Sequence, residues 1–547
     1  MKTDWNGKFG FLNKLRERLS IGGWSFRLLN RPQRIEKKEN PGVILLKIDG
    51  LGYELFEKAL AKKRLPFIRR LMQNASVSVK QFYSGMPSTT PAVQGELYYG
   101  VKTAVPAFEF FDREKAAVMT MYTPWAADAT GHMLEKNGEP LLRGGTSYSN
   151  VYAAGANEAR YCVQTMNMDS ILRATNPIRL AAILFFHTGK ILQMLAYAFL
   201  ELLLAVTDFF RGLIEKQNII KELKFIPTRI VICIVLRELI RFRVKLNIAR
   251  GVRIVHASFL GYDEQAHRRG PDSLFALRTL KGIDEVIKDI YQTAEKYEGR
   301  QYHIFIYSDH GQERVRSYEQ HAGKPIQTAL GAILSTVGSI ADISAPAFQE
   351  QPVSHHYQRA LRLLGFRSRQ RTNGENEAFS IQDIHITTKG PIGHIYFPAA
   401  MTDSQKTTIA EKLVREARVP MVLTLLGNRV NAFTRSGQFD LLTQYTLIFG
   451  DKREHPFARR VAADLGLLCR HSHAGDLVLS GWGRKDPPVS FAIENGAHGG
   501  PGSKETRSFV ILPPVIHFPG DVLRPLDLRS QVMSLSDSSE FDGYAAK

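Results

Sequence analysis

Carboxylate and imidazole side chains stand at four places in the sequence, each beside a run of apolar residues. In chain order they are Asp49, Asp263, His267, Asp309, His310 and His498. Carboxylate oxygens and imidazole nitrogens are the ligands that Zn²⁺ and similar borderline divalent ions take in proteins. Six ligands divide into two sets of three, and two ions about 4 Å apart stabilise both the attacking and the leaving oxygen of an in-line displacement. These residue types therefore predict a two-metal centre for phosphoryl transfer, with zinc expected and manganese as the alternative.

A nucleophile for such a reaction is expected in the stretch GMPSTTPAVQGELYYG, which contains Thr90. Threonine is a good N-cap residue, and proline, here Pro91, is favoured at the first helical position. We therefore expect Thr90 at a helix N-terminus, where amide groups and the helix dipole favour phosphate oxygens. Metal coordination would lower the pKa of its hydroxyl and so activate it. Because Thr89 is adjacent and Ser88 precedes it, the residues alone leave this choice open.

Buried strands are the elements that must position these side chains. Four runs read as strands, namely Val43–Ile48, Val252–Phe259, His303–Tyr307 and Ser508–Leu512. Asp49-Gly50 and a helical pattern over Tyr53–Met72 follow the first run, and strand, turn and helix in that order open an α/β fold. In open α/β sheets, sites lie beyond the carboxyl ends of strands. The polar clusters stand at or close to the ends of these runs.

The motifs together resemble those of the alkaline phosphatase superfamily, within it the type I phosphodiesterase/nucleotide pyrophosphatase branch. That family shows Asp-Gly after the first strand, Thr at a helix start, Asp-x-x-x-His followed by Gly-Pro, Asp-His, and a late His. Here these are Asp49-Gly50, Thr90, Asp263–His267 with Gly270-Pro271, Asp309-His310 and His498. The resemblance implies an α/β/α sandwich of three layers, with a mostly parallel central sheet, a helical insertion and an accessory subdomain.

The resemblance also implies roles for these residues. One metal ion would be held by Asp263, His267 and His498. The other would be held by Asp49, Asp309 and His310, with the Thr90 hydroxyl completing its shell. In the family a glycine follows the nucleophile ten residues on, and Gly100 stands at that distance from Thr90 rather than from Thr89.

Two further residues are expected near the substrate. Nucleotide pyrophosphatases of the family carry Asn three residues after the nucleophile, but Val93 stands there, and the neighbouring Gln94 is the expected substitute. His321, eleven residues after the Asp-His pair, is expected at the rim of the pocket. The departure at Val93 means that nucleotide specificity does not carry over.

Composition divides the chain and limits its partners. We expect a basic N-terminal segment (1–40), catalytic core in three parts (41–170, 251–333 and 481–528), an apolar and basic helical insertion (171–250), an accessory α/β region (334–480) and a disordered tail (529–547). The net charge of +19 raises two anionic partners, nucleic acid and a membrane surface, although by itself it favours an ordinary solvated basic surface. In the insertion, basic residues alternate with aliphatic ones, which favours an anionic membrane surface over nucleic acid. A buried helical cap over the active site is the alternative.

The stretch Ile191–Phe210 within the insertion is about long enough to cross a bilayer, but Glu201 near its centre weighs against a crossing. The N-terminus has no apolar signal region of 7–15 residues. We therefore expect a cytoplasmic protein, peripheral on the inner face of the membrane if the insertion binds lipid.

The predicted function is metal-dependent hydrolysis of a phosphodiester or pyrophosphate bond through a phosphothreonine intermediate, on a nucleotide or lipid substrate. Three alternatives remain open: a transferase that passes a phospho-headgroup between lipid-linked acceptors, a phosphomonoesterase of the same superfamily, and a membrane-docked scaffold with a structural metal site. Transfer to an added alcohol would distinguish the first, and binding without turnover the last.

Overall fold

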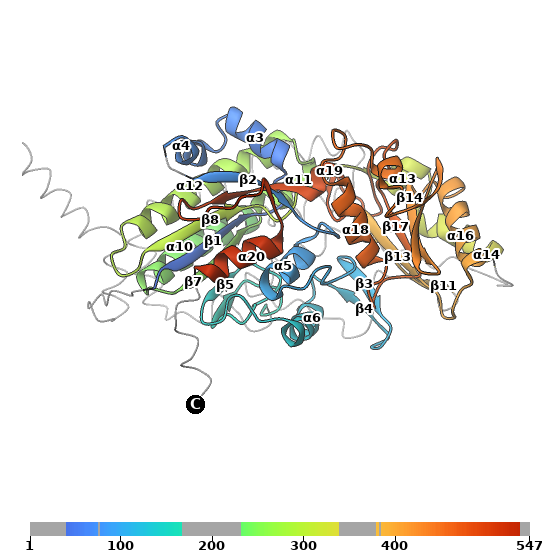
Figure 1. The fold of residues 1–547 in the computed structure, drawn as a ribbon, viewed down its shortest axis with the longest axis horizontal. Coiled ribbons are helices and arrows are strands. Elements are labelled where there is room, and N and C mark those ends of the chain that lie inside the picture. The colour runs from blue at the N-terminus through green and yellow to red at the C-terminus, as the bar shows by residue number, and fades with distance from the viewer. Residues whose placement is uncertain (1–39, 75–76, 167–230, 338–378, 382–383, 536–547) are drawn as a thin grey trace, which may run out of the picture.

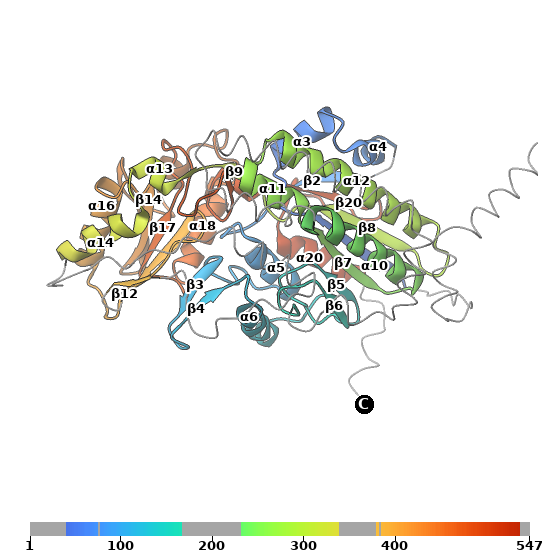
Figure 2. The ribbon, with the colours of Figure 1, turned by 180° about the vertical axis from the view of Figure 1, so that it is seen from behind.

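The computed structural model describes residues 40–74, 77–166, 231–337, 379–381 and 384–535. Within them the chain forms two large sheets that lie side by side (Figures 1 and 2). The predicted strands and their polar ends belong to the first sheet, so this sheet positions the site.

The central sheet has eight strands, and five of its seven strand pairs are parallel. In spatial order the strands are β21 (Val522–Leu523), β2 (Ser78–Tyr83), β20 (Arg507–Leu512), β8 (Tyr302–Tyr307), β1 (Gly42–Ile48), β7 (Ile254–Phe259), β5 (Thr146–Tyr148) and β6 (Glu158–Arg160). β1 is buried along its whole length between β7 and β8, as its apolar sequence requires. The predicted α/β class and mostly parallel sheet are confirmed.

Helices cover both faces of this sheet and complete three layers (Figure 1). One face packs against α3 (Tyr53–Ala61), α4 (Pro66–Asn74), α10 (Arg237–Ala249), α11 (Gly261–Arg269) and α12 (Leu274–Glu295). The other face packs against α5 (Thr90–Tyr99), α6 (Pro124–Asn137) and α20 (Pro525–Ser534). Each face therefore has its own apolar core, with the sheet between them.

The single helix predicted over Tyr53–Met72 is wrong, because the chain turns between α3 and α4. Lys63 has φ 54°, a left-handed conformation that stops a helix. Pro66 then begins α4, since proline is tolerated in the first turn but not in a helix interior.

The predicted start of a disordered tail at residue 529 is also wrong, because α20 continues to Ser534. Leu528 and Val532 are fully buried in the core around α5. The Arg529 guanidinium donates to the carbonyl oxygens of Tyr98 (2.6 Å) and Glu139 (2.7 Å). Two buried apolar residues and these hydrogen bonds explain why a polar sequence stays helical here.

The second sheet is antiparallel throughout and has seven strands. In spatial order they are β11 (Phe379–Ile381), β12 (Ile384–Thr387), β13 (Ile392–Tyr396), β17 (Leu477–Ser480), β14 (Met421–Leu426), β15 (Arg429–Thr434) and β16 (Gly437–Asp440). Helices α14 (Ile326–Val337) and α16 (Asp403–Arg415) belong to the core on one face, and α17 (Tyr445–Phe449) and α18 (Ala458–Leu468) to the core on the other. The seven strands, α16, α17 and α18 lie within the predicted accessory region (334–480), whereas α14 begins before it, at Ile326; the region's boundaries stay a prediction.

Most of the predicted insertion, including Ile191–Phe210, lies outside the described residues. Its described end is helical, with a π-helix over Val231–Leu236 that runs into α10. In the part of the chain that the structure describes, no helix is both long and apolar enough to cross a membrane.

Candidate active site

The structure brings the six predicted carboxylate and imidazole residues together as two groups of three. The first triad is Asp263, His267 and His498, and the second triad is Asp49, Asp309 and His310. Within each triad one ligand atom per residue lies within 4.8 Å of the others. The His310 and His498 rings stack with their centroids 3.7 Å apart, so the two triads adjoin.

The second triad forms where two parallel neighbours in the central sheet end. Lys47 of β1 pairs in register with Tyr307 of β8, so Asp49 and Asp309 emerge side by side. Gly50 permits the tight turn after β1, with φ +73°. A Cβ atom at this position would lie 2.5 Å from an Asp263 carboxylate oxygen, so glycine also lets the two triads approach each other.

The first triad is built from a helix and a loop. Asp263 and His267 stand four residues apart on α11, which places them on one face of that helix. His498 follows the short strand β19 (Gly496–Ala497), which pairs with β9 (Glu313–Arg314) just after the Asp309-His310 pair. The late histidine is thus held beside the end of β8, although it is far away in sequence.

All three imidazoles turn Nε2 toward the carboxylates of the triads and Nδ1 away from them. The Nδ1 atom of His267 lies 2.8 Å from a Glu494 carboxylate oxygen, that of His498 lies 3.1 Å from the Ser88 carbonyl oxygen, and that of His310 lies 3.1 Å from the Gly311 carbonyl oxygen. These partners are all acceptors, so each Nδ1 donates and each Nε2 is the nitrogen left to bind an ion once it has lost its proton. Histidine ligands of metal ions are oriented in this way, and the donor sets therefore fit two divalent ions.

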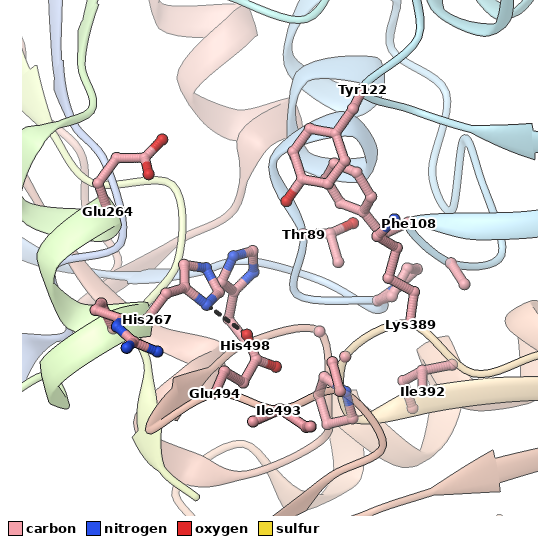
Figure 3. Close-up of a pocket in the computed structure, with 17 residues that line it drawn as sticks. Thr89, Phe108, Tyr122, Glu264, His267, Lys389, Ile392, Ile493, Glu494 and His498 are labelled. Atoms are coloured by element: carbon pink, nitrogen blue, oxygen red, sulfur yellow. Dashed lines mark hydrogen bonds and ion pairs between the residues drawn. The ribbon is translucent and has the colours of Figure 1, made fainter. Parts of the chain in front are cut away.

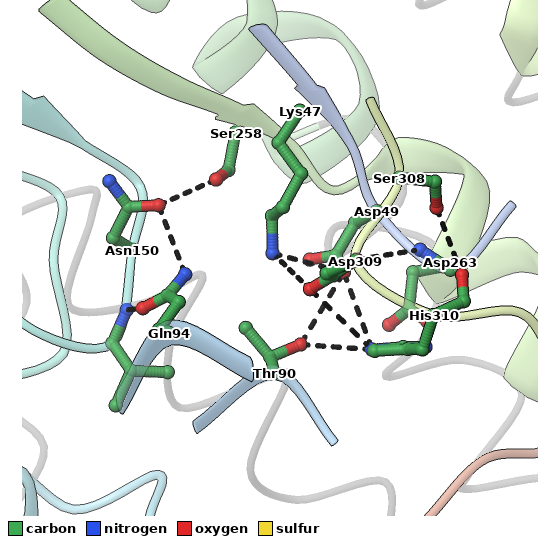
Figure 4. Close-up of polar contacts among 12 residues, drawn as sticks. Lys47, Asp49, Thr90, Gln94, Asn150, Ser258, Asp263, Ser308, Asp309 and His310 are labelled. Atoms are coloured by element: carbon green, nitrogen blue, oxygen red, sulfur yellow. Dashed lines mark hydrogen bonds and ion pairs between the residues drawn. The ribbon is translucent and has the colours of Figure 1, made fainter. Parts of the chain in front are cut away.

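Two neighbouring side chains donate to the carboxylates. The Lys47 ammonium lies 2.6 Å from Asp309 Oδ2 and 3.3 Å from Asp49 Oδ1 (Figure 4). Gln312 donates from its amide to Asp263 Oδ1. The two triads therefore differ in the donor that contacts their carboxylates: an ammonium in the second and a neutral amide in the first.

The local charges shift the pKa values of both triads. Burial raises the pKa of Asp49, and the charge of Asp309 raises it further. Burial alone would raise the pKa of Asp309, but the charges of His310 and Lys47 outweigh it and hold this pKa below the usual range. Burial would lower the pKa of His267, yet Asp263 and Glu494 raise it to about 10. Both clusters thus attract positive charge, as proton or as cation.

Thr90 lies against the second triad. Its hydroxyl oxygen is 3.1 Å from His310 Nε2 and 3.4 Å from Asp49 Oδ1. The predicted N-cap role is wrong by one position, because Thr89 is the N-cap and Thr90 begins α5. This shift turns the Thr90 side chain to the carboxylates. Thr89 instead lines a pocket with its hydroxyl oxygen buried, and the Ser88 hydroxyl is bonded to Gly500 and Gly499.

A pocket runs from the first triad toward the second sheet (Figure 3). His267 and His498 form one end of it. Phe108 and Tyr122, whose ring centroids are 4.1 Å apart, line it farther from the triad, and Lys389 lies 5.5 Å from the Tyr122 ring centroid. The lining thus combines aromatic and aliphatic side chains with four charged ones, namely Glu264, Arg268, Lys389 and Glu494.

Gln94 and His321 do not lie where we predicted them. Gln94 is fully buried, its amide nitrogen donates to Asn150 (3.1 Å), and its carbonyl oxygen accepts from the Val151 backbone (2.8 Å). It therefore ties α5 to a neighbouring loop. The His321 ring lies 3.2 Å from the Arg418 carbonyl oxygen, and this residue does not line the pocket. Sequence distance from the Asp-His pair misled the second prediction, because β9 and β10 (Arg316–Ser317) carry the chain away.

Sequence reasoning missed several residues that touch the triads. Lys47 was the one charge in an apolar strand, and its spacing of two from Asp49 placed both side chains on the same face, so a signal existed. Glu494 and Gln312 reach the first triad only through the tertiary fold, and nothing in their local sequence marked them.

Comparison with known proteins found one family model and several similar structures. The family model for type I phosphodiesterase/nucleotide pyrophosphatase matches residues 43–445, a range that includes Thr90 and every triad residue except His498. No curated protein matches the chain by sequence. The structure is similar to murine ectonucleotide pyrophosphatase/phosphodiesterase 5 with bound AMP, at 11% identity and a TM-score of 0.45, covering 90% of this chain and 94% of that one. It is also similar to phosphonoacetate hydrolase from Sinorhizobium meliloti with bound phosphonoacetate, at 14% identity and a TM-score of 0.47, covering 90% and 96%. The match over most of its length establishes that the chain belongs to the type I phosphodiesterase/nucleotide pyrophosphatase family, whose members are metal-dependent phosphoryl-transfer hydrolases.

Proposed function

We propose that the protein hydrolyses a phosphodiester or pyrophosphate bond through a phosphothreonine on Thr90. The observation that carries this proposal is the position of the Thr90 hydroxyl, 3.1 Å from His310 Nε2 and 3.4 Å from Asp49 Oδ1. A hydroxyl at a helix N-terminus beside a metal-binding cluster has what a nucleophile needs: activation and a site for phosphate oxygens.

The two triads would hold two divalent ions, Zn²⁺ or Mn²⁺. Bound there, the ions would supply positive charge that lowers the pKa of a hydroxyl and neutralises charge on the transferring group. The residues of the chain do the rest. Thr90 attacks phosphorus from one side while the bond to the leaving oxygen breaks on the other, and water then cleaves the bond between phosphorus and the Thr90 oxygen.

The pocket favours a substrate with an organic group on the phosphorus. It begins at His267 and His498 and continues along apolar and aromatic side chains, which an inorganic phosphate ion would not contact favourably. The Phe108–Tyr122 pair suits a flat or aliphatic group. Lys389 beside the pair, which also lies 3.8 Å from the Glu109 carboxylate, suits a substituent with a hydrogen-bond acceptor. A nucleotide and a phospholipid headgroup ester both have this chemistry.

Turnover of bis-p-nitrophenyl phosphate and p-nitrophenyl phosphate, with Zn²⁺ or Mn²⁺ and with chelator, tests the proposal. We expect the diester to be the better substrate and the chelator to abolish its cleavage. Thr90→Ala should lower the diesterase rate about 1,000-fold or more. Thr89→Ala is the comparison variant: it removes an adjacent hydroxyl outside both triads, and although Thr89 lines the pocket it should lower the rate far less than Thr90→Ala. Mass spectrometry of the acid-quenched protein should find phosphate on the Thr90 peptide.

Other outcomes would redirect the assignment. Full activity in Thr90→Ala would overturn the proposed nucleophile. Preference for the monoester would make the protein a phosphomonoesterase of the same superfamily. If the diester is consumed without hydrolysis and its phosphoryl group is transferred to an added alcohol, the protein is a transferase.

A further inference from the structure

Lys47 is a buried charge that the proposed reaction does not use. It is the second-to-last residue of β1, a strand that is otherwise apolar, and it is 0% exposed. Burying an ammonium is costly unless it is paired and hydrogen-bonded. Its nitrogen lies 2.6 Å from Asp309 Oδ2 and 3.3 Å from Asp49 Oδ1, so both of its partners belong to the second triad (Figure 4).

The same contacts change the charge that this triad offers to a metal ion. Asp49 and Asp309 are its two carboxylates, and His310 would bind an ion as a neutral ligand through Nε2, because its Nδ1 donates to a carbonyl oxygen. With both carboxylates ionised, the triad alone would carry two negative charges. The Lys47 ammonium cancels one of them, and it would also repel a divalent ion held by the same two carboxylates.

The first triad has different neighbours. Asp263 accepts from the neutral amide of Gln312, and His267 donates to the Glu494 carboxylate. A carboxylate behind a histidine ligand raises its basicity and strengthens metal binding. The contacts around the first triad therefore favour a divalent ion, whereas the contact around the second competes with one.

We infer that Lys47 is a permanent cation that shares Asp49 and Asp309 with the second metal ion, so that the second triad binds its ion later and more weakly than the first. The inference rests on the proposed assignment of the two triads as metal sites. Lys47 acts through the carboxylates and is a positioning residue. It keeps two adjoining carboxylates in place when the second ion is absent, and it sets how readily that ion leaves.

Metal titration of the full chain against a chelating dye, with Zn²⁺ alone and without substrate, tests this inference. Wild-type protein should take up two ions in two steps whose dissociation constants differ by about tenfold or more. Asp309→Asn should remove the weaker step, and Asp263→Asn the tighter one. If Asp309→Asn instead removed the tighter step, the inference would be overturned, and this test does not require substitution of Lys47.

Lys47→Met then isolates the charge, because methionine has a similar length and no charge. We expect it to tighten the weaker step about tenfold or more and to leave the tighter step unchanged. It should also lower the melting temperature of the chelated protein and enlarge the rise on adding Zn²⁺. A merely structural lysine would not give tighter binding. Lys245→Met is the matched control. Lys245 lies on α10 and pairs with Asp289 of α12 (2.9 Å), outside both triads.

An unchanged or weaker second step in Lys47→Met would refute the inference. Should Lys47→Met fail to fold, Lys47→Gln removes the charge and keeps a hydrogen-bond donor, with the same expectations. The proposed function fails separately: two bound ions without turnover would refute hydrolysis and leave the inference intact, whereas absence of metal binding would refute both.

Discussion

The two triads have the same ligand chemistry but occupy different kinds of place in the molecule. The second triad continues two central strands, and Asp309 and His310 are 0% exposed. The first triad comes from helix α11 and a loop, its residues are half-buried, and two of them line the pocket. One triad is therefore part of the core of the protein, and the other is part of its opening to solvent. We therefore expect substitutions in the second triad to affect folding as well as activity, and substitutions in the first triad to affect mainly metal and substrate binding.

The largest expected effect is the loss of activity when a ligand of either triad is replaced. Asp309→Asn and His267→Gln should each lower diesterase turnover about 1,000-fold or more, because neither ion alone stabilises both oxygens of the displacement. Metal analysis should find one ion per chain in each variant. A variant that keeps a tenth of the activity with one ion would show that its triad is dispensable for the reaction.

A substitution behind the first triad should affect that triad alone. Glu494→Gln weakens the acceptor that orients His267, and we expect the tighter of the two zinc dissociation constants to rise 10–100-fold. The weaker constant should stay within about twofold, because Glu494 does not contact the second triad. Competition with a chelating dye measures both, and an equal change in the two constants would contradict the comparison.

The triads should also respond differently to alkali in the chelated protein. The pKa of His267 is raised to about 10, so its contribution to stability is complete below its ordinary pKa of about 6.5 and is lost as the pH rises through about 10. The pKa of Lys47 is raised above 10.5 by Asp309 and Asp49, against the opposing effect of burial, so its contribution persists over that interval.

Melting temperatures of chelated wild type, His267→Gln and Lys47→Met between pH 6.5 and 10 test this difference. The gap between wild type and His267→Gln should shrink as the pH rises, while the gap to Lys47→Met should stay constant. Two gaps that shrink together would mean that the triads are not electrostatically distinct.

The smallest expected effect concerns the pocket beside the first triad. Phe108→Ala should raise KM for the aromatic diester about fivefold and change kcat less than twofold, because it removes an aromatic contact of about 1 kcal/mol that ground and transition states share. Phe439→Ala on β16 is the control, because this side chain lies in the second sheet and does not line the pocket. Steady-state kinetics with both variants would distinguish them.

Much of the site was predictable because it lies at strand ends. Apolar runs located β1, β7, β8 and β20. Asp49 and Asp309-His310 closely follow two of these runs, so they could be recognised as site residues from the sequence alone. The motif order supplied Asp263, His267 and His498, which no local pattern would have joined to them.

The remainder depended on contacts between distant segments. The break at Lys63 needs a left-handed residue that sequence does not mark, and the helix over Pro525–Ser534 is held by partners on α5. Gln94 was misassigned because its position beside the nucleophile helix start suggested substrate, whereas the fold uses its amide to bind Asn150. Local pattern identifies elements and their ends, while partners across the core decide what a polar side chain does.

The place of β20 in the central sheet bears on how the protein is made. β20 comes late in the chain but lies between β2 and β8, and its antiparallel pairs join them. During synthesis, β2 and β8 emerge well before this strand and expose unpaired backbone edges until it arrives. His498 emerges just before β20, so the last ligand of the first triad and the strand that closes the sheet reach the folding chain together. We therefore expect nascent chains that end before residue 498 to bind chaperones, and metal loading to follow release of the chain from the ribosome.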